Sequence, residues 1–193
     1  AGALKESSKD DITLIAGDLV PAGTDHYYQK IQEITEILAG NSVYSLRGNH
    51  DTGAYTEYFG EKNYALLMEH FTVVVLDNAF RSFEEEGLTL LSRVLAMEEV
   101  KQVIIAFHIP VPNHFILNSV PDEEFARLQN AYRPWKEKVK YLLCGHVHSR
   151  FIDLVDDIPL ICTGGGGAMI EDVSKDIRAC DIEHHIVHFY EKD

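Results

Sequence analysis

The residues best suited to chemistry lie in one short segment, Arg47-Gly48-Asn49-His50-Asp51. The segment follows the apolar residues 43–46, so we expect a buried strand that ends in a polar loop. Asn alone is a common turn residue. An Asn followed by His and Asp, however, supplies three side chains that bind a metal ion or move a proton. We therefore interpret this segment as one wall of a metal-centred site.

Three more apolar segments are each followed by a residue that binds metals. Residues 12–16 precede Asp18, residues 103–107 precede His108, and residues 141–144 precede a Gly-His-Val-His segment. The carboxyl ends of parallel strands lie at one edge of a sheet, where ligands bind. We therefore expect one cluster of side chains, made up of Asp18, Asn49, His108, His146 and His148. This mixture of nitrogen and oxygen ligands favours zinc, iron or manganese.

Each of these residues alone has an ordinary structural explanation. Asp18 is typical of a turn, and a single His108 is more often structural. His146 and His148 are two positions apart, which places both on one face of a strand. In an extended loop they would instead turn toward two different metal ions. Only the joint occurrence at strand ends favours a metal site over these explanations.

The elements that must position these residues form an alternating pattern. Leucines and isoleucines at steps of three and four predict helices over residues 27–38 and 84–96. The remaining expected elements are hairpins over 64–67 with 71–76 and 151–155 with 160–163, a helix around 123–131, and a last strand over 182–190. A glycine-rich turn is expected at 164–167. This order predicts a single α/β domain over residues 1–193.

The composition excludes several classes of protein. The chain has 193 residues, 46% of them hydrophobic, and a net charge of −14. That charge makes nucleic acid an improbable partner, whereas a phosphorylated small molecule remains compatible because bound metals reverse the local charge. Three widely spaced cysteines predict reduced thiols and a cytoplasmic protein. No apolar run approaches the roughly 18 residues of a membrane span, and the first residues do not resemble a signal peptide.

Together the motifs resemble those of the calcineurin-like metallophosphoesterases. Gly17-Asp18, the Gly-Asn-His-Asp segment, His108 and the Gly-His-Val-His segment occur in the family's order, G-D, G-N-H-[DE], His and G-H-x-H. The resemblance implies two packed mixed β-sheets flanked by helices, an αββα sandwich. It also implies an enzyme of the phosphodiesterase and phosphatase branch that hydrolyses phosphate mono- or diesters.

The resemblance further implies a role for each residue. Two divalent ions, of manganese, iron or zinc, would activate a water nucleophile. Asp18 would bridge these ions, and His148 would bind the first of them. The second ion would be bound by Asn49, His108 and His146.

Three residues of the opening segment would serve catalysis. His50 would donate a proton to the leaving alkoxide or contact the phosphate, and Asp51 would orient the His50 imidazole. Arg47 resembles a phosphate-binding arginine of the family. Outside these motifs, the long connection over residues 109–135 is expected to form a rim that selects the substrate, with Asn113 and His114 as candidates.

The family's first motif, D-x-H, does not occur, because no histidine precedes His26. We expect a fragment that lacks the first strand of the domain; the alternative is the loss of half of one metal site. The missing motif favours a rival function, a catalytically impaired interaction module of the same fold. The retained histidines oppose that rival, and the net charge opposes a nuclease of the same fold.

Overall fold

A computed structural model describes residues 2–10, 12–172, 177–184 and 186–189. Its largest sheet has six strands in the order β3-β4-β5-β6-β8-β7. The inner strands pair in parallel, and β3 and β7 are antiparallel edges. The strands are β3 (Tyr64–Leu67), β4 (Thr72–Val75), β5 (Val103–Ala106), β6 (Val139–Cys144), β7 (Arg150–Val155) and β8 (Ile158–Thr163). Every residue of β4 and β5 is buried, as expected for apolar strands covered on both faces.

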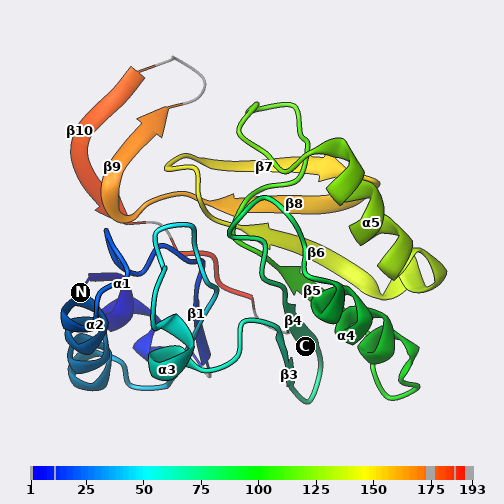
Figure 1. Ribbon diagram of the computed structural model, residues 1–193, viewed down its shortest axis with the longest axis horizontal. Helices are drawn as coiled ribbons and strands as arrows, with labels where there is room; N and C mark the ends of the chain where they lie inside the picture. The colour runs from blue at the N-terminus through cyan, green and yellow to red at the C-terminus, as the bar shows by residue number, and fades with distance from the viewer. Residues whose placement is uncertain (1, 11, 173–176, 185, 190–193) are drawn as a thin grey trace.

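A second, smaller sheet covers one face of the first. It pairs β1 (Ile12–Ile15) with β2 (Ser42–Ser45) in parallel. Leu46 and Leu14 pack from this sheet against residues of β4 and β5. The outer side of β1 and β2 carries three helices, α1 (Gly2–Glu6), α2 (Asp25–Leu38) and α3 (Tyr55–Phe59) (Figure 1). The link from β1 to β2 runs through α2.

The opposite face of the six-stranded sheet is covered by α4 (Glu85–Ala96) and α5 (Asp122–Tyr132) (Figure 1). Leu91 and Leu95 of α4 and Leu128 of α5 are fully buried in the main hydrophobic core. Two 3₁₀ helices, Ser7–Lys9 and Arg133–Lys138, complete the helical elements of the described residues. The expected α/β architecture, two packed sheets flanked by helices, is thereby confirmed.

A separate hairpin of β9 (Gly166–Asp172) and β10 (Ile177–His184) corrects the prediction for the last part of the chain. The strand expected over 182–190 ends at His184, and residues 186–189 are not in a strand. Residues 185 and 190 lie outside the described residues. Part of the expected glycine-rich turn belongs to β9, which the sequence conceals because glycine is uncommon in strands. Within the described ranges, no helix combines the length and hydrophobicity needed to cross a bilayer.

Candidate metal centre

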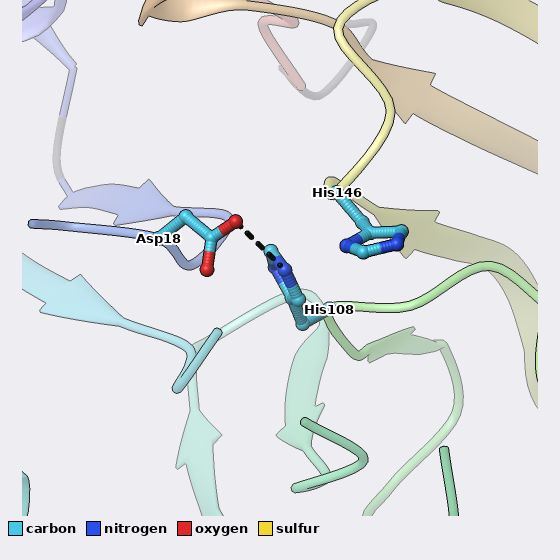
Figure 2. A group of neighbouring side chains, drawn as sticks. All are labelled: Asp18, His108 and His146. Carbon is cyan, nitrogen blue, oxygen red and sulfur yellow. Dashed lines mark ion pairs between the residues drawn. The ribbon is translucent and has the colours of Figure 1, made fainter. Parts of the chain in front are cut away.

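The loops that follow β1, β5 and β6 bring Asp18, His108 and His146 to one place. Figure 2 shows these three side chains gathered from separate loops, with the Asp18 carboxylate and the His108 ring in contact. His108 Nε2 lies 3.3 Å from Asp18 Oδ2. The potential ligand atoms of the three residues all lie within 4.8 Å of one another. The prediction that residues following the strand ends lie together is therefore correct for these three residues.

Asn49, in the loop after β2, joins the same cluster. Its Oδ1 lies 3.2 Å from His108 Nε2 and 2.9 Å from His146 Nδ1. An amide oxygen offers only lone pairs, so it is suited to a hydrogen-bond donor or a metal ion. Both sheets thus contribute to the cluster, with Asp18 and Asn49 from the small sheet and two imidazoles from the large one.

The orientation of His108 suits a cation at this point. His108 Nδ1 lies 2.8 Å from the carbonyl oxygen of Ala16. A carbonyl only accepts hydrogen bonds, so Nδ1 carries a proton and Nε2 is the ring nitrogen that a cation could use. Nε2 faces oxygens of Asp18 and Asn49, which are also potential metal ligands. Such a donor set fits one divalent cation, and a backbone carbonyl is a common partner for a metal-binding histidine.

The backbone at this centre is held in unusual conformations. Asp18 has φ 53° and His146 has φ 65°, both in the left-handed region that residues other than glycine rarely adopt. Gly17 has φ 87°, and a Cβ at that position would lie 2.4 Å from His108 Nδ1. Glycine is therefore required for the close approach of His108. Left-handed residues of this kind cluster at functional sites.

The electrostatics of the cluster match metal binding. The pKa of Asp18 is lowered: burial acts to raise it, but the contacts with His108 and the His50 backbone N–H outweigh burial. Burial, together with the charge of His108, lowers the pKa of His146 to about 4, and Arg81 and His148 contribute to this shift. At neutral pH His146 is therefore uncharged, the form in which an imidazole binds a cation.

His148 lies near this cluster without belonging to it. Its charge contributes to the lowered pKa of His146. Among the described residues, however, the group whose ligand atoms lie within 4.8 Å of one another contains Asp18, His108 and His146. The assignment of His148 to a further metal ion stays a prediction.

His50 lies at the solvent side of the centre, with an exposed side chain. Its backbone N–H donates to Asp18 Oδ1 at 2.9 Å. Its Nδ1 lies 3.1 Å from the carbonyl oxygen of Pro21. The main chain of His50 therefore positions the Asp18 carboxylate, and its Nδ1 contacts Pro21.

Asp51 does not orient His50, which corrects the sequence prediction. Its buried carboxylate accepts hydrogen bonds from the backbone N–H groups of Gly48 at 2.8 Å, Leu19 at 3.2 Å and Val20 at 3.3 Å. Burial raises the pKa of Asp51, although these N–H groups act in the opposite direction. Asp51 therefore joins the loop after β1 to the loop after β2. The His50 ring instead contacts the carbonyl oxygen of Pro21.

Arg47 is held by a carboxylate that sequence reasoning missed. Its Nε donates to Asp77 Oδ1 at 3.2 Å, and its Nη2 forms an ion pair with Asp77 Oδ2. The guanidinium also lies 4.9 Å from the centre of the Phe80 ring. Asp77 therefore neutralises much of the Arg47 charge, and the expected contact of Arg47 with phosphate stays a prediction.

Asn78 is a second residue that sequence reasoning missed. Its buried Oδ1 accepts from the backbone N–H groups of His108 at 3.0 Å and Ile109 at 2.9 Å. Its Nδ2 donates to the carbonyl oxygen of Ile109 at 2.7 Å. Asn78 and Asp77 follow the apolar strand 71–76, so the strand-end rule would have selected both had it been applied there.

The loop after His108 reaches the centre through Asn118, another missed residue. Asn118 Nδ2 lies 2.9 Å from His146 Nε2. The two expected rim residues have structural contacts instead. Asn113 Oδ1 accepts from the backbone N–H groups of Phe115 and Ile116, and His114 pairs with Asp153 at 3.1 Å.

Comparison with known proteins agrees with this geometry. The model of the calcineurin-like phosphoesterase family matches residues 2–150. The chain belongs to the calcineurin-like phosphoesterase family. A search of curated proteins by sequence finds no significant match. The matched residues include every member of the metal cluster described above.

Solved structures show the same fold at low sequence identity. GAP50, the anchor in the inner membrane complex of Plasmodium, superposes with a TM-score of 0.64 at 13% identity, over 87% of this chain and 65% of that one. A dimetal phosphatase from Danio rerio superposes with a TM-score of 0.64 at 13% identity, over 85% of this chain and 76% of that one. The chain thus spans just under two thirds of the length of the Plasmodium protein.

Proposed function

We propose that this member of the family hydrolyses phosphate esters with a divalent metal bound by Asp18, Asn49, His108 and His146. The observation that carries the proposal is the orientation of His108. Its Nδ1 is hydrogen-bonded to the Ala16 carbonyl, so its Nε2 faces two oxygens at a point suited to a cation. When bound, the cation stabilises negative charge on phosphoryl oxygens and makes water a better nucleophile at neutral pH.

The protein residues complete this chemistry. The backbone N–H of His50 holds the Asp18 carboxylate in place. The exposed His50 imidazole, when protonated, transfers its proton to the alkoxide oxygen as the bond from phosphorus to that oxygen breaks. Asp51 supports both by fixing the loop that carries His50 to the loop that carries Asp18.

The metal content and substrate follow from the same proposal. The ligand set suits manganese, iron or zinc, and His148 would help to bind a second ion. The substrate would be a phosphorylated small molecule or a phosphodiester. The net charge of −14 opposes nucleic acid. The retained cluster of metal ligands gives no support to a purely structural interaction module.

An assay of the metal-loaded protein tests the proposal. The protein is treated with EDTA, dialysed and supplied with Mn²⁺, and then given 4-nitrophenyl phosphate and bis(4-nitrophenyl) phosphate. We expect release of nitrophenol from at least one ester, loss of that activity on adding EDTA, and a large decrease in the His146→Ala variant. Bound Mn²⁺ with turnover of neither ester would overturn the proposal.

A further inference from the structure

Arg81 is an exposed arginine on a turn that is hydrogen-bonded to Asn78. Its backbone N–H donates to the carbonyl oxygen of Asn78 at 2.9 Å, and its φ is 65°. Asn78 is in turn bound to the backbone of His108 and Ile109. The turn that carries Arg81 is therefore fixed to the same loop that supplies a metal ligand.

The Arg81 guanidinium connects to the metal cluster through one side chain. Its Nη2 donates to Asn118 Oδ1, and its Nη1 donates to the carbonyl oxygen of Ser119 at 2.6 Å. Asn118 Nδ2 then lies 2.9 Å from His146 Nε2. Because His146 Nδ1 faces Asn49, Arg81 and Asn118 lie beyond the opposite nitrogen of the imidazole, away from the point where the ligand atoms meet.

The charge of Arg81 has no acidic partner in the described part of the chain. Arg47 pairs with Asp77, and Arg127 pairs with Glu85 and Glu124. What sets Arg81 apart from the other arginines without an acidic partner is its link to His146 through Asn118. A guanidinium has five N–H donors, and the contacts of Arg81 leave some of them available to an anion.

We propose that Arg81 and Asn118 form a subsite for a second phosphoryl group of the substrate, beyond the phosphate that reaches the metal centre. The amide of Asn118 and the ring of His146 separate the guanidinium from the point where the proposed ligand atoms meet, so the two anionic groups would be bound at different places. Guanidinium groups bind phosphate oxygens through paired, charge-assisted hydrogen bonds. The preference for a diphosphorylated substrate rests on the proposed function, whereas binding of an anion at Arg81 does not.

Titration of metal-free protein with inorganic phosphate tests the subsite directly. We expect a saturable shift of the Arg81 Nε–H signal in nuclear magnetic resonance spectra. Arg81→Gln should weaken this binding by about tenfold or more, since a charge-assisted pair is lost. Asn118→Asp, which places a carboxylate against the guanidinium, should weaken it as well. Arg93→Gln, at an exposed position of α4, removes an equal charge and should change the affinity less than about twofold, because a surface charge that does not touch the anion is screened by salt.

Two results of this titration would overturn the proposal. One is the absence of a saturable shift of the Arg81 signal. The other is equal weakening by Arg81→Gln and Arg93→Gln, which would assign the effect to net charge. Retained dispersion of the amide signals shows that each variant is folded.

A kinetic comparison then separates this inference from the proposed function. A monophosphate ester and the diphosphate of the same alcohol are given to the Mn²⁺-loaded protein. Arg81→Gln should raise KM for the diphosphate by about tenfold and leave the monophosphate nearly unchanged. Equal losses on both substrates would contradict a second subsite. Failure of the wild-type protein on both esters would reject the proposed function alone, because the phosphate titration decides the anion site without turnover.

Discussion

At the scale of single residues, His50 is the side chain whose chemistry is most separable from metal binding. Its contact with Asp18 is made by the backbone N–H, so removing the imidazole leaves that contact intact. We expect His50→Ala to lower kcat by about 10²–10⁴-fold, the usual contribution of a general acid, with unchanged metal content.

The measurements are kcat in the presence of Mn²⁺ and metal content by mass spectrometry. His26→Ala, which removes another exposed imidazole on α2, is the matched control and should change neither quantity. Loss of metal from His50→Ala, or an unchanged kcat, would contradict the role assigned to His50.

The sequence predicted the residues of the cluster better than it predicted the residues that support them. Asp18, Asn49 and His108 each follow an apolar strand closely, and strand ends meet for a general geometric reason. Asn118 instead comes from the interior of a long loop, where long-range contacts decide the path of the chain. The prediction that Asp51 orients His50 is wrong because adjacency in sequence does not fix the direction of side chains within a turn.

At the scale of elements, Asp51 joins the loop after β1 to the loop after β2. Asp51→Asn keeps the shape but turns an NH₂ group toward backbone N–H donors, leaving at least one of them without a partner. We expect the free energy of unfolding to decrease by about 1–3 kcal/mol, measured by urea denaturation. Glu98→Gln, at an exposed position, serves as the control. Equal stability of Asp51→Asn and wild type would show that the contact does not stabilise the loops.

Asp156 ties the turn between β7 and β8 to the helices on the outer face. It accepts hydrogen bonds from Tyr132 Oη at 2.7 Å and Lys136 Nζ at 2.9 Å. Burial acts to raise the pKa of Asp156, but Lys136 and Tyr132 outweigh burial and lower it. A lowered pKa means that the folded state favours the ionised carboxylate, so this stabilisation is present at neutral pH and is lost as pH falls through the folded pKa.

We therefore expect Asp156→Ala to decrease the free energy of unfolding by about 1–2 kcal/mol at neutral pH. The difference from wild type should shrink as pH falls below about 4, because the carboxylate becomes protonated first in the unfolded chain and then, at lower pH, in the folded protein. Urea denaturation of both proteins across this pH range measures it. A difference that does not change with pH would show that the Asp156 charge contributes nothing.

Elements with strong periodicity were predicted within a few residues. Helix α4 and strand β5 are examples: the apolar face of α4 packs on the main core, and β5 is buried on both faces. The hairpin of β9 and β10 was not predicted, because β9 begins with glycines and, among the described residues, pairs only with β10.

At the scale of the whole molecule, the metal centre joins the two sheets. Asp18 and Asn49 come from the loops of the small sheet, and His108 and His146 from those of the large one. The alternation of strands and helices predicted a layered α/β fold, and the family resemblance implied two sheets, but neither indicated which strands would form each sheet. That partition depends on packing between distant segments, such as Leu14 and Leu46 against β4 and β5.

A ligand that bridges the sheets should stabilise the entire fold. We expect Mn²⁺ or Zn²⁺ to raise the unfolding temperature of EDTA-treated protein by about 5–10 °C at free metal roughly 100 times its Kd. Differential scanning calorimetry measures this shift, with Mg²⁺ as the comparison ion because it is less suited to imidazole ligands. Equal shifts with all three ions would indicate binding to surface carboxylates instead.

The measurement that tests the account most directly is calorimetric titration of Mn²⁺ or Zn²⁺ into EDTA-treated wild type and Asp18→Asn. We expect at least one ion to bind per chain. Asp18→Asn should weaken binding by more than about tenfold, since even outer partners of metal ligands contribute that much. Asp25→Asn, which removes an equal charge at the exposed start of α2, should leave affinity nearly unchanged. Equal affinities for wild type and Asp18→Asn would contradict the metal centre.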